Sequence, residues 1–368
     1  MSDQTWQATP SSSHSYPCQS CGARLEFAPG TNALRCPYCG HMQQLADTGR
    51  QVTEHSYDEL ARLPRKPVAS LAANVFACQK CGAKTESDAL ADVCQFCGAA
   101  VVAEVSGGEM VVPEAVLPFV VDRSGVREAL RKWVRSRWFA PSKLKRVSET
   151  EQVRGTYLPH WTYDARTVSD YTGQRGEHYY TTETYTDSDG NQQTRQVQHT
   201  RWYPASGTVS RDFDDVLVSG TRRLDNKYLD KLTPWPLHLA QPYQPDYLAG
   251  YTALRYEVEP EAGLEVAKGQ MGKVIHTDCE GDIGGDEQRV QSIQTRYFDL
   301  MFKLMLLPVW LAAYIYAGRT FQVMVNAHTG EVVGQRPYSV WKIIFAIFTA
   351  IAVISIIIVL IALGHHHR

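Results

Sequence analysis

The sequence predicts an α+β multidomain protein with two N-terminal zinc ribbons, a basic amphipathic helix, a β-rich domain and one C-terminal transmembrane helix. Three observations support this prediction: eight cysteines in four Cys-x-x-Cys pairs before residue 100, a strand-like pattern from Thr156 to Gln335, and an uninterrupted apolar run near the C-terminus. The chain has 368 residues, 44% of them hydrophobic, which is enough for two or three domains with cores of their own.

The first predicted ribbon covers residues 17–45 and the second covers residues 75–105. Each contains two Cys-x-x-Cys-Gly motifs, in which a tight turn directs two sulfurs toward one ion and glycine adopts a backbone conformation that a side chain would hinder. The two motifs are separated by 14 residues in the first ribbon and by 12 residues in the second, which is enough for a short hairpin between them. The predicted ligands of two structural Zn²⁺ ions are Cys18, Cys21, Cys36, Cys39, Cys78, Cys81, Cys94 and Cys97.

Four thiolates per ion leave no position for water, so the predicted sites are structural rather than catalytic. Reduced thiolates favour a reducing compartment, which indicates that this part of the chain faces the cytoplasm. Residues 1–110 contain eight Lys or Arg and eleven Asp or Glu. This acidic balance favours protein partners for the ribbons and leaves nucleic acid as the alternative.

Polar segments flank the first ribbon. Residues 1–16 are expected to be a disordered tail, and residues 46–74 a linker to the second ribbon. No apolar segment typical of a signal peptide is found in the tail.

The third predicted unit, residues 111–335, begins with a helix at about 124–139. Val126, Leu130 and Val134 share one face of this helix, and arginines follow at positions 127, 131 and 135. A solvated face, attachment to anionic lipid and contact with nucleic acid are three interpretations of these basic residues.

The rest of this unit is expected to be mostly β. Asp189-Gly190 between two Thr- and Tyr-rich stretches predicts a hairpin, and a shorter helix is expected at about 261–271. Leu158-Pro159-His160-Trp161 recurs as Leu307-Pro308-Val309-Trp310. We interpret this echo as either a duplicated β-unit or a chance match of two tetrapeptides.

Residues 343–363 contain neither a charged residue nor a proline and, as a helix, would span about 30 Å, the thickness of the hydrocarbon layer. The sequence therefore predicts a single-pass membrane protein, with the bilayer as one partner and most of the chain in the cytoplasm.

No constellation typical of an enzyme is present in the sequence. There is no phosphate loop, no Gly-x-Ser-x-Gly elbow and no His-Glu-x-x-His motif. Cys279 is expected to be a buried small side chain, and the acidic residues between 278 and 287 a solvated loop, with a calcium site as the alternative. We expect the protein not to be an enzyme.

Several segments together resemble a known family. They are the cysteine motifs, LPFVVDRSGVREALRKWVRSRWFAP, YLPHWTYDA, LLPVW, VNAHTGEVVGQRPYS and the apolar C-terminal run. The set is similar to bacterial membrane proteins described as TFIIB-type zinc-ribbon-containing, often labelled primosomal replication-factor-Y-like helicases. The helicase label does not fit, because the chain lacks the phosphate loop and the acidic metal-binding strand of a nucleotide-driven motor.

The resemblance implies partners of the flotillin-like or phage-shock type, in envelope stress or membrane organisation. Together with the residue patterns it predicts a non-enzymatic, tail-anchored adaptor that recruits protein partners to the bacterial inner membrane. The alternative is a membrane-attached nucleic-acid-binding zinc-ribbon protein.

Overall fold

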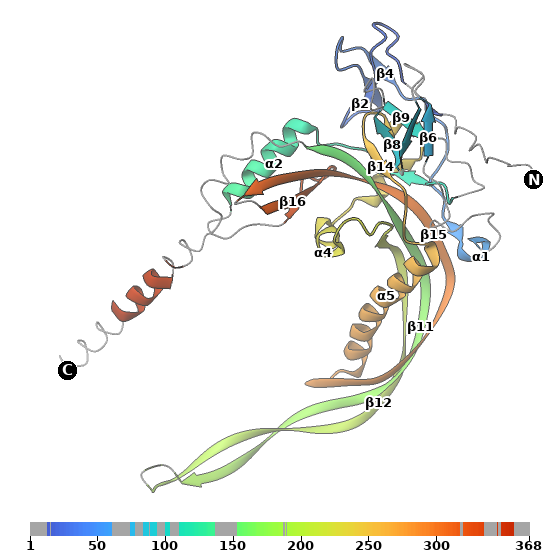
Figure 1. The fold of residues 1–368 in the computed structure, drawn as a ribbon. Coiled ribbons are helices and arrows are strands. Elements are labelled where there is room, and N and C mark those ends of the chain that lie inside the picture. The colour runs from blue at the N-terminus through green and yellow to red at the C-terminus, as the bar shows by residue number, and fades with distance from the viewer. Residues whose placement is uncertain are drawn as a thin grey trace, which may run out of the picture.

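The fold is built on one 12-stranded sheet, with a 3-stranded and a 2-stranded sheet beside it (Figure 1). The computed structural model describes residues 13–14, 16–60, 74–77, 84–87, 89–93, 100–103, 110–136, 153–186, 188, 190–316, 319–334, 344 and 347–356. Three very long strands dominate the large sheet: β11 (Arg154–Thr186), β12 (Gln192–Ser219) and β15 (Glu287–Tyr316). They pair antiparallel in the order β12–β11–β15 and curve into a crescent (Figure 1).

The hairpin predicted around Asp189-Gly190 is confirmed. Gly190 has a φ of +86°, which glycine adopts without strain, and the flanking residues are the end of β11 and the start of β12.

The helix α5 (Pro260–Ile283) lies along the concave side of the crescent (Figure 1). Its buried residues recur every three or four positions, so one face packs on the sheet: Leu264, Ala267, Met271, Ile275, Cys279 and Ile283. These side chains form one core cluster with Trp161, Tyr163, Phe302 and Leu304 of the long strands. The predicted helix at 261–271 is therefore real but much longer, because packing on the sheet compensates for its glycines.

The basic helix α2 (Arg123–Arg135) is close to its predicted position, although residues 137–139 of the prediction lie outside the described residues. The side chain of Asp122 caps it by accepting a hydrogen bond of 2.8 Å from the Gly125 N–H. Val126, Leu130 and Val134 are buried, as the sequence pattern predicts.

Shorter elements complete the described chain. The strands are β1 (Ser13–His14), β2 (Glu26–Phe27), β3 (Ala33–Arg35), β4 (Met42–Gln44), β5 (His55–Ser56), β6 (Asn74–Ala77), β7 (Lys84–Ser87), β8 (Ala89–Val93), β9 (Ala100–Ala103), β10 (Ala115–Val116), β13 (Gln241–Pro242), β14 (Thr252–Leu254), β16 (Arg319–Asn326) and β17 (Val332–Gly334). The helical elements are α1 (Tyr57–Leu60), α4 (Asn226–Leu229) and the 3-10 helices η2 (Asp230–Leu232), η3 (Leu237–Leu239) and η4 (Pro245–Leu248).

Part of the segment expected to be a linker, residues 46–74, packs on this sheet. β5 pairs with β15, and the N–H of Thr53 and the ring of His55 both contact the buried Glu114 carboxylate at 3.3 Å. Residues 61–73 lie outside the described residues, as do residues 1–12 and 15 of the expected tail.

The two Leu-Pro-x-Trp tetrapeptides occupy equivalent places in the fold. They lie on adjacent antiparallel strands, with Leu158 opposite Leu307. The indole N–H of Trp161 donates to the Val258 carbonyl just before α5, and that of Trp310 donates to the Val121 carbonyl just before α2, both at 2.8 Å.

The strands that precede these two helices also match. β10 pairs in parallel with β15 from Met305, five residues before its tryptophan, and β14 pairs in parallel with β11 from Thr156, again five residues before the tryptophan. Each of the two units consists of a short strand, a helix and a long strand: β10, α2 and β11 in the first, and β14, α5 and β15 in the second. The short strand and the segment before the helix of each unit make the same contacts with the long strand of one tetrapeptide. This shared register favours duplication over a chance match.

The predicted α+β multidomain fold with a C-terminal transmembrane helix is wrong. Strands dominate the described chain, and none of its described helices is long and apolar enough to cross a bilayer. Residues 344 and 347–356 of the predicted span are described, and all of them are helical. Residues 343, 345–346 and 357–363 of that span lie outside the described residues. This finding also overturns the predicted single-pass localisation at the inner membrane.

Candidate metal centre

Two similar turns present the first four cysteines. The first turn contains Cys18 and Cys21, and the second contains Cys36 and Cys39. The N–H of Gly22 donates to the Cys18 carbonyl at 2.8 Å, and the N–H of Gly40 donates to the Cys36 carbonyl at 3.0 Å. Both glycines have positive φ values, +69° and +74°, with no other atom within 4 Å of where a Cβ would lie. The backbone conformation alone therefore requires glycine at these positions.

The four sulfurs converge on one point. The Sγ atoms of Cys18 and Cys39 are 3.6 Å apart, as are those of Cys21 and Cys36, and all four lie within 4.8 Å of one another. A tetrahedral ion with metal–sulfur bonds of about 2.3 Å requires sulfurs about 3.8 Å apart. This cluster can therefore bind a metal ion.

The environment of the sulfurs favours a thiolate at Cys36 and a protonated thiol at Cys21. Hydrogen bonds from the backbone N–H groups of Cys39 and Tyr38 lower the pKa of Cys36 to about 6. The N–H of Ala23 lowers the pKa of Cys21, but contact with the Cys39 thiol and burial outweigh it and raise this pKa to about 12. The cluster thus holds its first negative charge at Cys36, and a bound cation would displace the remaining protons.

The first ribbon is packed into the β-domain. β2, β3 and β4 form its three-stranded sheet, and the Phe27 ring lies 5.2 Å from that of Tyr247. The Phe27 N–H donates to Ala249 at 2.9 Å, and its carbonyl accepts from the Tyr251 hydroxyl at 3.3 Å. Cys18 and Cys36 belong to the same buried cluster as these aromatic rings, so the metal centre and the domain share a core.

The other four predicted ligands, Cys78, Cys81, Cys94 and Cys97, lie outside the described residues. The described strands pair across each Cys-x-x-Cys motif, whereas a hairpin between the two motifs was expected. β6 and β7 meet at Ala77 and Lys84 on either side of the first pair, and β8 and β9 meet at Val93 and Ala100 on either side of the second. β8 also pairs with β14, which joins this region to the large sheet.

A second polar cluster was not predicted from the sequence. Carboxylate oxygens of Glu54, Asp164, Asp214 and Asp215 lie within 4.8 Å of one another. Lys303, whose side chain is only 7% exposed, donates to Glu54 at 2.7 Å and to Asp215 at 2.6 Å. Its ammonium group already supplies a cation. The sequence feature that could have indicated this cluster is Lys303, a lysine within the apolar run MFKLMLLPVW.

Asp164 is the unusual member of this cluster. Burial, together with a hydrogen bond to Glu54, raises its pKa to about 7. The hydrogen bond from Asp164 lowers the pKa of Glu54. The two carboxyl groups therefore share a proton near neutral pH.

The expected solvated loop between 278 and 287 is wrong for its first part, because Asp278, Glu280 and Asp282 lie on α5. Cys279 is fully buried on α5, and burial raises its pKa, which disfavours a reactive thiolate. Asp282 accepts a hydrogen bond from the Tyr171 hydroxyl at 2.6 Å, and Asp286 accepts from the His178 N–H at 2.7 Å. These two hydrogen bonds connect the last turn of α5 and the residues that follow it to β11.

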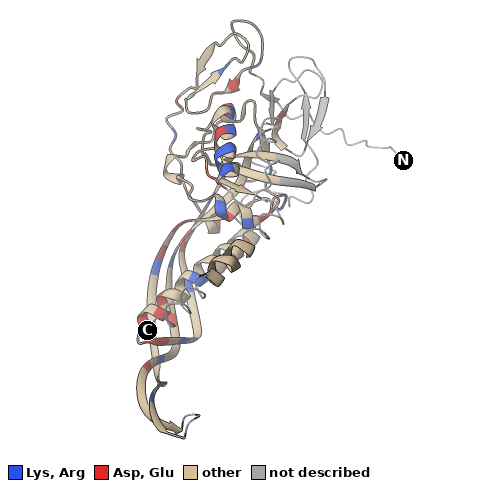
Figure 2. Cartoon of the chain, turned by 90° about the vertical axis from the view of Figure 1, so that its left-hand side faces the viewer, with Lys and Arg blue, Asp and Glu red and all other residues tan. Residues whose placement is uncertain are grey.

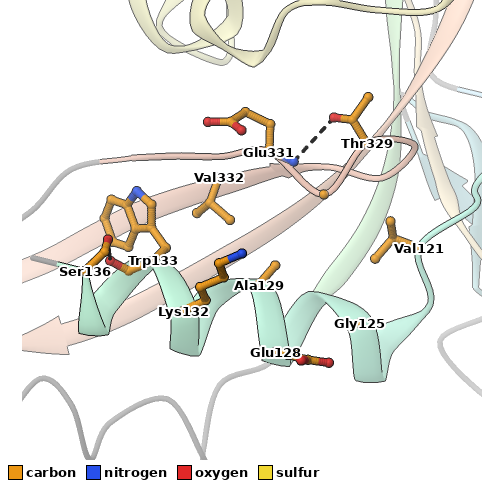
Figure 3. A pocket seen from close by; sticks show the side chains of 11 residues that line it. Val121, Gly125, Glu128, Ala129, Lys132, Trp133, Ser136, Thr329, Glu331 and Val332 are labelled. Atoms are coloured by element: carbon orange, nitrogen blue, oxygen red, sulfur yellow. Dashed lines mark hydrogen bonds between the residues drawn. The ribbon is translucent and has the colours of Figure 1, made fainter.

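Two hollows flank α2. One, of about 560 Å³, lies between the helix and the turn at 329–332, and Trp133, Ala129 and Lys132 line its helical side (Figure 3). The other, of about 680 Å³, lies between the first ribbon and the start of α2. We call the second one the ribbon groove; its lining includes Phe27, Pro29, Arg35, Pro37, Arg123 and Tyr251.

The β11–β12 hairpin projects well beyond the rest of the sheet (Figure 1). β15 stops pairing at Gly176, so Glu177–Thr186 pair only with Gln192–Arg201. We call this two-stranded part the β-blade; at about 3.3 Å per residue it is about 33 Å long.

The β-blade exposes tyrosines on both faces. On one face, Tyr179 stacks on His199 at 5.3 Å and Arg201 lies 5.0 Å above its ring. On the other face, Tyr180 is 61% exposed. Tyr185, 45% exposed, lies near the tip.

Comparison with known proteins gives one informative relative. The chain is 26% identical over 340 residues to the uncharacterized protein YdjG of Bacillus subtilis (strain 168), covering 89% of this chain and 92% of that protein. No family model matches the chain. No solved structure matches it. The resemblance to TFIIB-type zinc-ribbon proteins therefore stays a prediction.

Proposed function

We propose that the protein is a non-enzymatic binding protein that recruits protein partners through the β-blade, and that zinc ribbons stabilise the body from which the β-blade projects. The β-blade carries this proposal. A two-stranded hairpin without further packing is marginally stable in water, and most of its side chains contribute to no core. Its exposed tyrosines and arginines are the residue types enriched where proteins bind one another.

The proposed ion in the first ribbon is zinc, because four soft thiolates in a tetrahedron suit Zn²⁺ and complete its coordination. A closed site has no position at which substrate or water could bind, which supports a structural role. We extend the same role to a second zinc ion held by Cys78, Cys81, Cys94 and Cys97, because they also form two Cys-x-x-Cys pairs, separated by 12 residues where the first quartet has 14.

Site-specific photocrosslinking in the native cells tests this proposal. A photoreactive phenylalanine analogue replaces Tyr180 or Tyr185 on the β-blade, or, as the control, the exposed Leu239 of η3. We expect a discrete protein adduct from both β-blade positions and none from Leu239. Adducts that are absent, or equally frequent at all three positions, would contradict the proposal.

A further inference from the structure

One flank of α2 carries a row of basic side chains, and Figure 2 shows Lys and Arg recurring along a helix. Arg123, Arg127, Arg131 and Arg135 are all exposed, and none forms an ion pair with a residue that the structure describes. We call these four residues the arginine row. Glu128 is the single acidic residue of α2. Like charges this close repel one another, so the row favours an anionic partner.

The arginine row has a regular spacing. Its members follow one another at every fourth position, so each lies about 6 Å further along the helix axis and the whole row spans about 18 Å. In an extended peptide, alternate side chains are about 6.7 Å apart on one face. An extended segment with acidic residues at alternate positions therefore matches the row.

The ribbon groove continues this surface at the start of α2. Arg35 and Arg123 line the groove and form no ion pair with the described residues. The two carboxylates of the groove are already engaged: Glu26 pairs with Arg24 at 2.7 Å, and Asp122 caps α2. With Arg24 included, three arginines stand against two carboxylates at the groove, beside an apolar lining of prolines, Phe27 and Tyr251.

These features favour a peptide over a nucleic acid. Proteins that bind single strands combine basic residues with aromatic side chains on which bases stack. The one aromatic residue of α2, Trp133, lines the hollow on the other flank of the helix (Figure 3). Proline and aromatic side chains in a groove are typical of peptide recognition.

We infer that the arginine row and the ribbon groove together bind an extended acidic segment of a partner protein. This inference rests on the proposed function, because it adds a second contact for a protein partner. The acidic side chains would lie along α2, and one end of the segment would enter the groove beside the first ribbon.

Fluorescence anisotropy with the full chain tests the inference. The probe is a labelled dodecapeptide of alternating glutamate and valine, and the matched peptide has glutamine in place of glutamate. We expect the glutamine peptide to bind at least about tenfold more weakly, because several ion pairs of up to about 1 kcal/mol each are lost. The double variant Arg127→Glu/Arg131→Glu should weaken binding of the glutamate peptide by a similar factor, and Arg35→Glu by about threefold.

The matched control is Lys231→Glu/Lys273→Glu, which reverses two exposed charges away from α2 and should change binding by less than about twofold. Equal weakening by both double variants, or equal binding of the two peptides, would overturn the inference. So would displacement of the peptide by a 12-nucleotide oligothymidine that binds more tightly. Crosslinks from the β-blade are measured separately, so the inference can fail while the proposed function stands.

Discussion

The replacement Phe27→Ala tests whether the first ribbon and the β-domain unfold as one unit. The Phe27 side chain is 1% exposed and packs against Tyr247 and other rings of the domain. Burial of about 150 Å² of aromatic surface at about 25 cal/mol per Å² contributes about 4 kcal/mol, of which alanine retains about 1. We therefore expect the free energy of unfolding to fall by about 3 kcal/mol, in the range of measured Phe→Ala changes.

Urea unfolding provides the assay, with circular dichroism reporting the sheet and a colorimetric chelator reporting metal release. In a single cooperative unit, both transitions shift to lower urea together. The control is Tyr38→Ala, because Tyr38 is 80% exposed on the second cysteine turn and should change stability by less than about 0.5 kcal/mol. The reasoning is refuted if Phe27→Ala advances metal release but leaves unfolding of the sheet within 0.5 kcal/mol of the original protein.

Three further predictions concern single side chains. Gly22→Ala should destabilise the ribbon by about 1–2 kcal/mol and speed metal loss to a chelator, because Gly22 has a φ of +69°. The control Gly272→Ala should stabilise the protein by about 0.5–1 kcal/mol, because Gly272 is helical and has no atom within 4 Å of the added Cβ. A stabilising Gly22→Ala together with a destabilising Gly272→Ala would contradict this prediction. Lys303→Met should destabilise the protein by about 3–5 kcal/mol at pH 7.5 in urea unfolding, because two carboxylates lose their cation, and a change below 1 kcal/mol would show that they are solvated. Burial lowers the pKa of His160 from 6.5 to about 4, so as the pH falls from 6.5 to 4 only the unfolded chain gains a proton at this residue. The free energy of unfolding therefore falls by up to about 1.4 kcal/mol per pH unit in this range. His160→Asn should remove this part of the acid sensitivity, and an unchanged dependence of stability on pH would refute the assignment.

Local patterns were sufficient to predict the elements that depend on neighbouring residues. The first cluster of four cysteines, the buried face of α2 and the hairpin at Gly190 all follow from spacing within a short segment. The echo of the two tetrapeptides left duplication and a chance match open, and the register around Trp161 and Trp310 favours duplication.

Features that depend on distant pairing could not be predicted. Lys303 meets Glu54 and Asp215, which are far away in the sequence and become neighbours only through the strand register. The length of α5 depends on packing against the concave face rather than on helix propensity. The predicted membrane span relied on apolar composition alone, and none of the described helices is long and apolar enough to cross a bilayer.

X-ray absorption spectroscopy of the zinc-loaded protein tests the central claim, which is that the first ribbon holds a structural ion with closed coordination. The four cysteines of the second quartet are replaced by serine, so that the spectrum reports only Cys18, Cys21, Cys36 and Cys39. The account predicts four sulfur neighbours at about 2.3 Å and no nitrogen or oxygen neighbour. A shell with a water or other light-atom ligand would contradict it, because an open position would make the centre a candidate for catalysis.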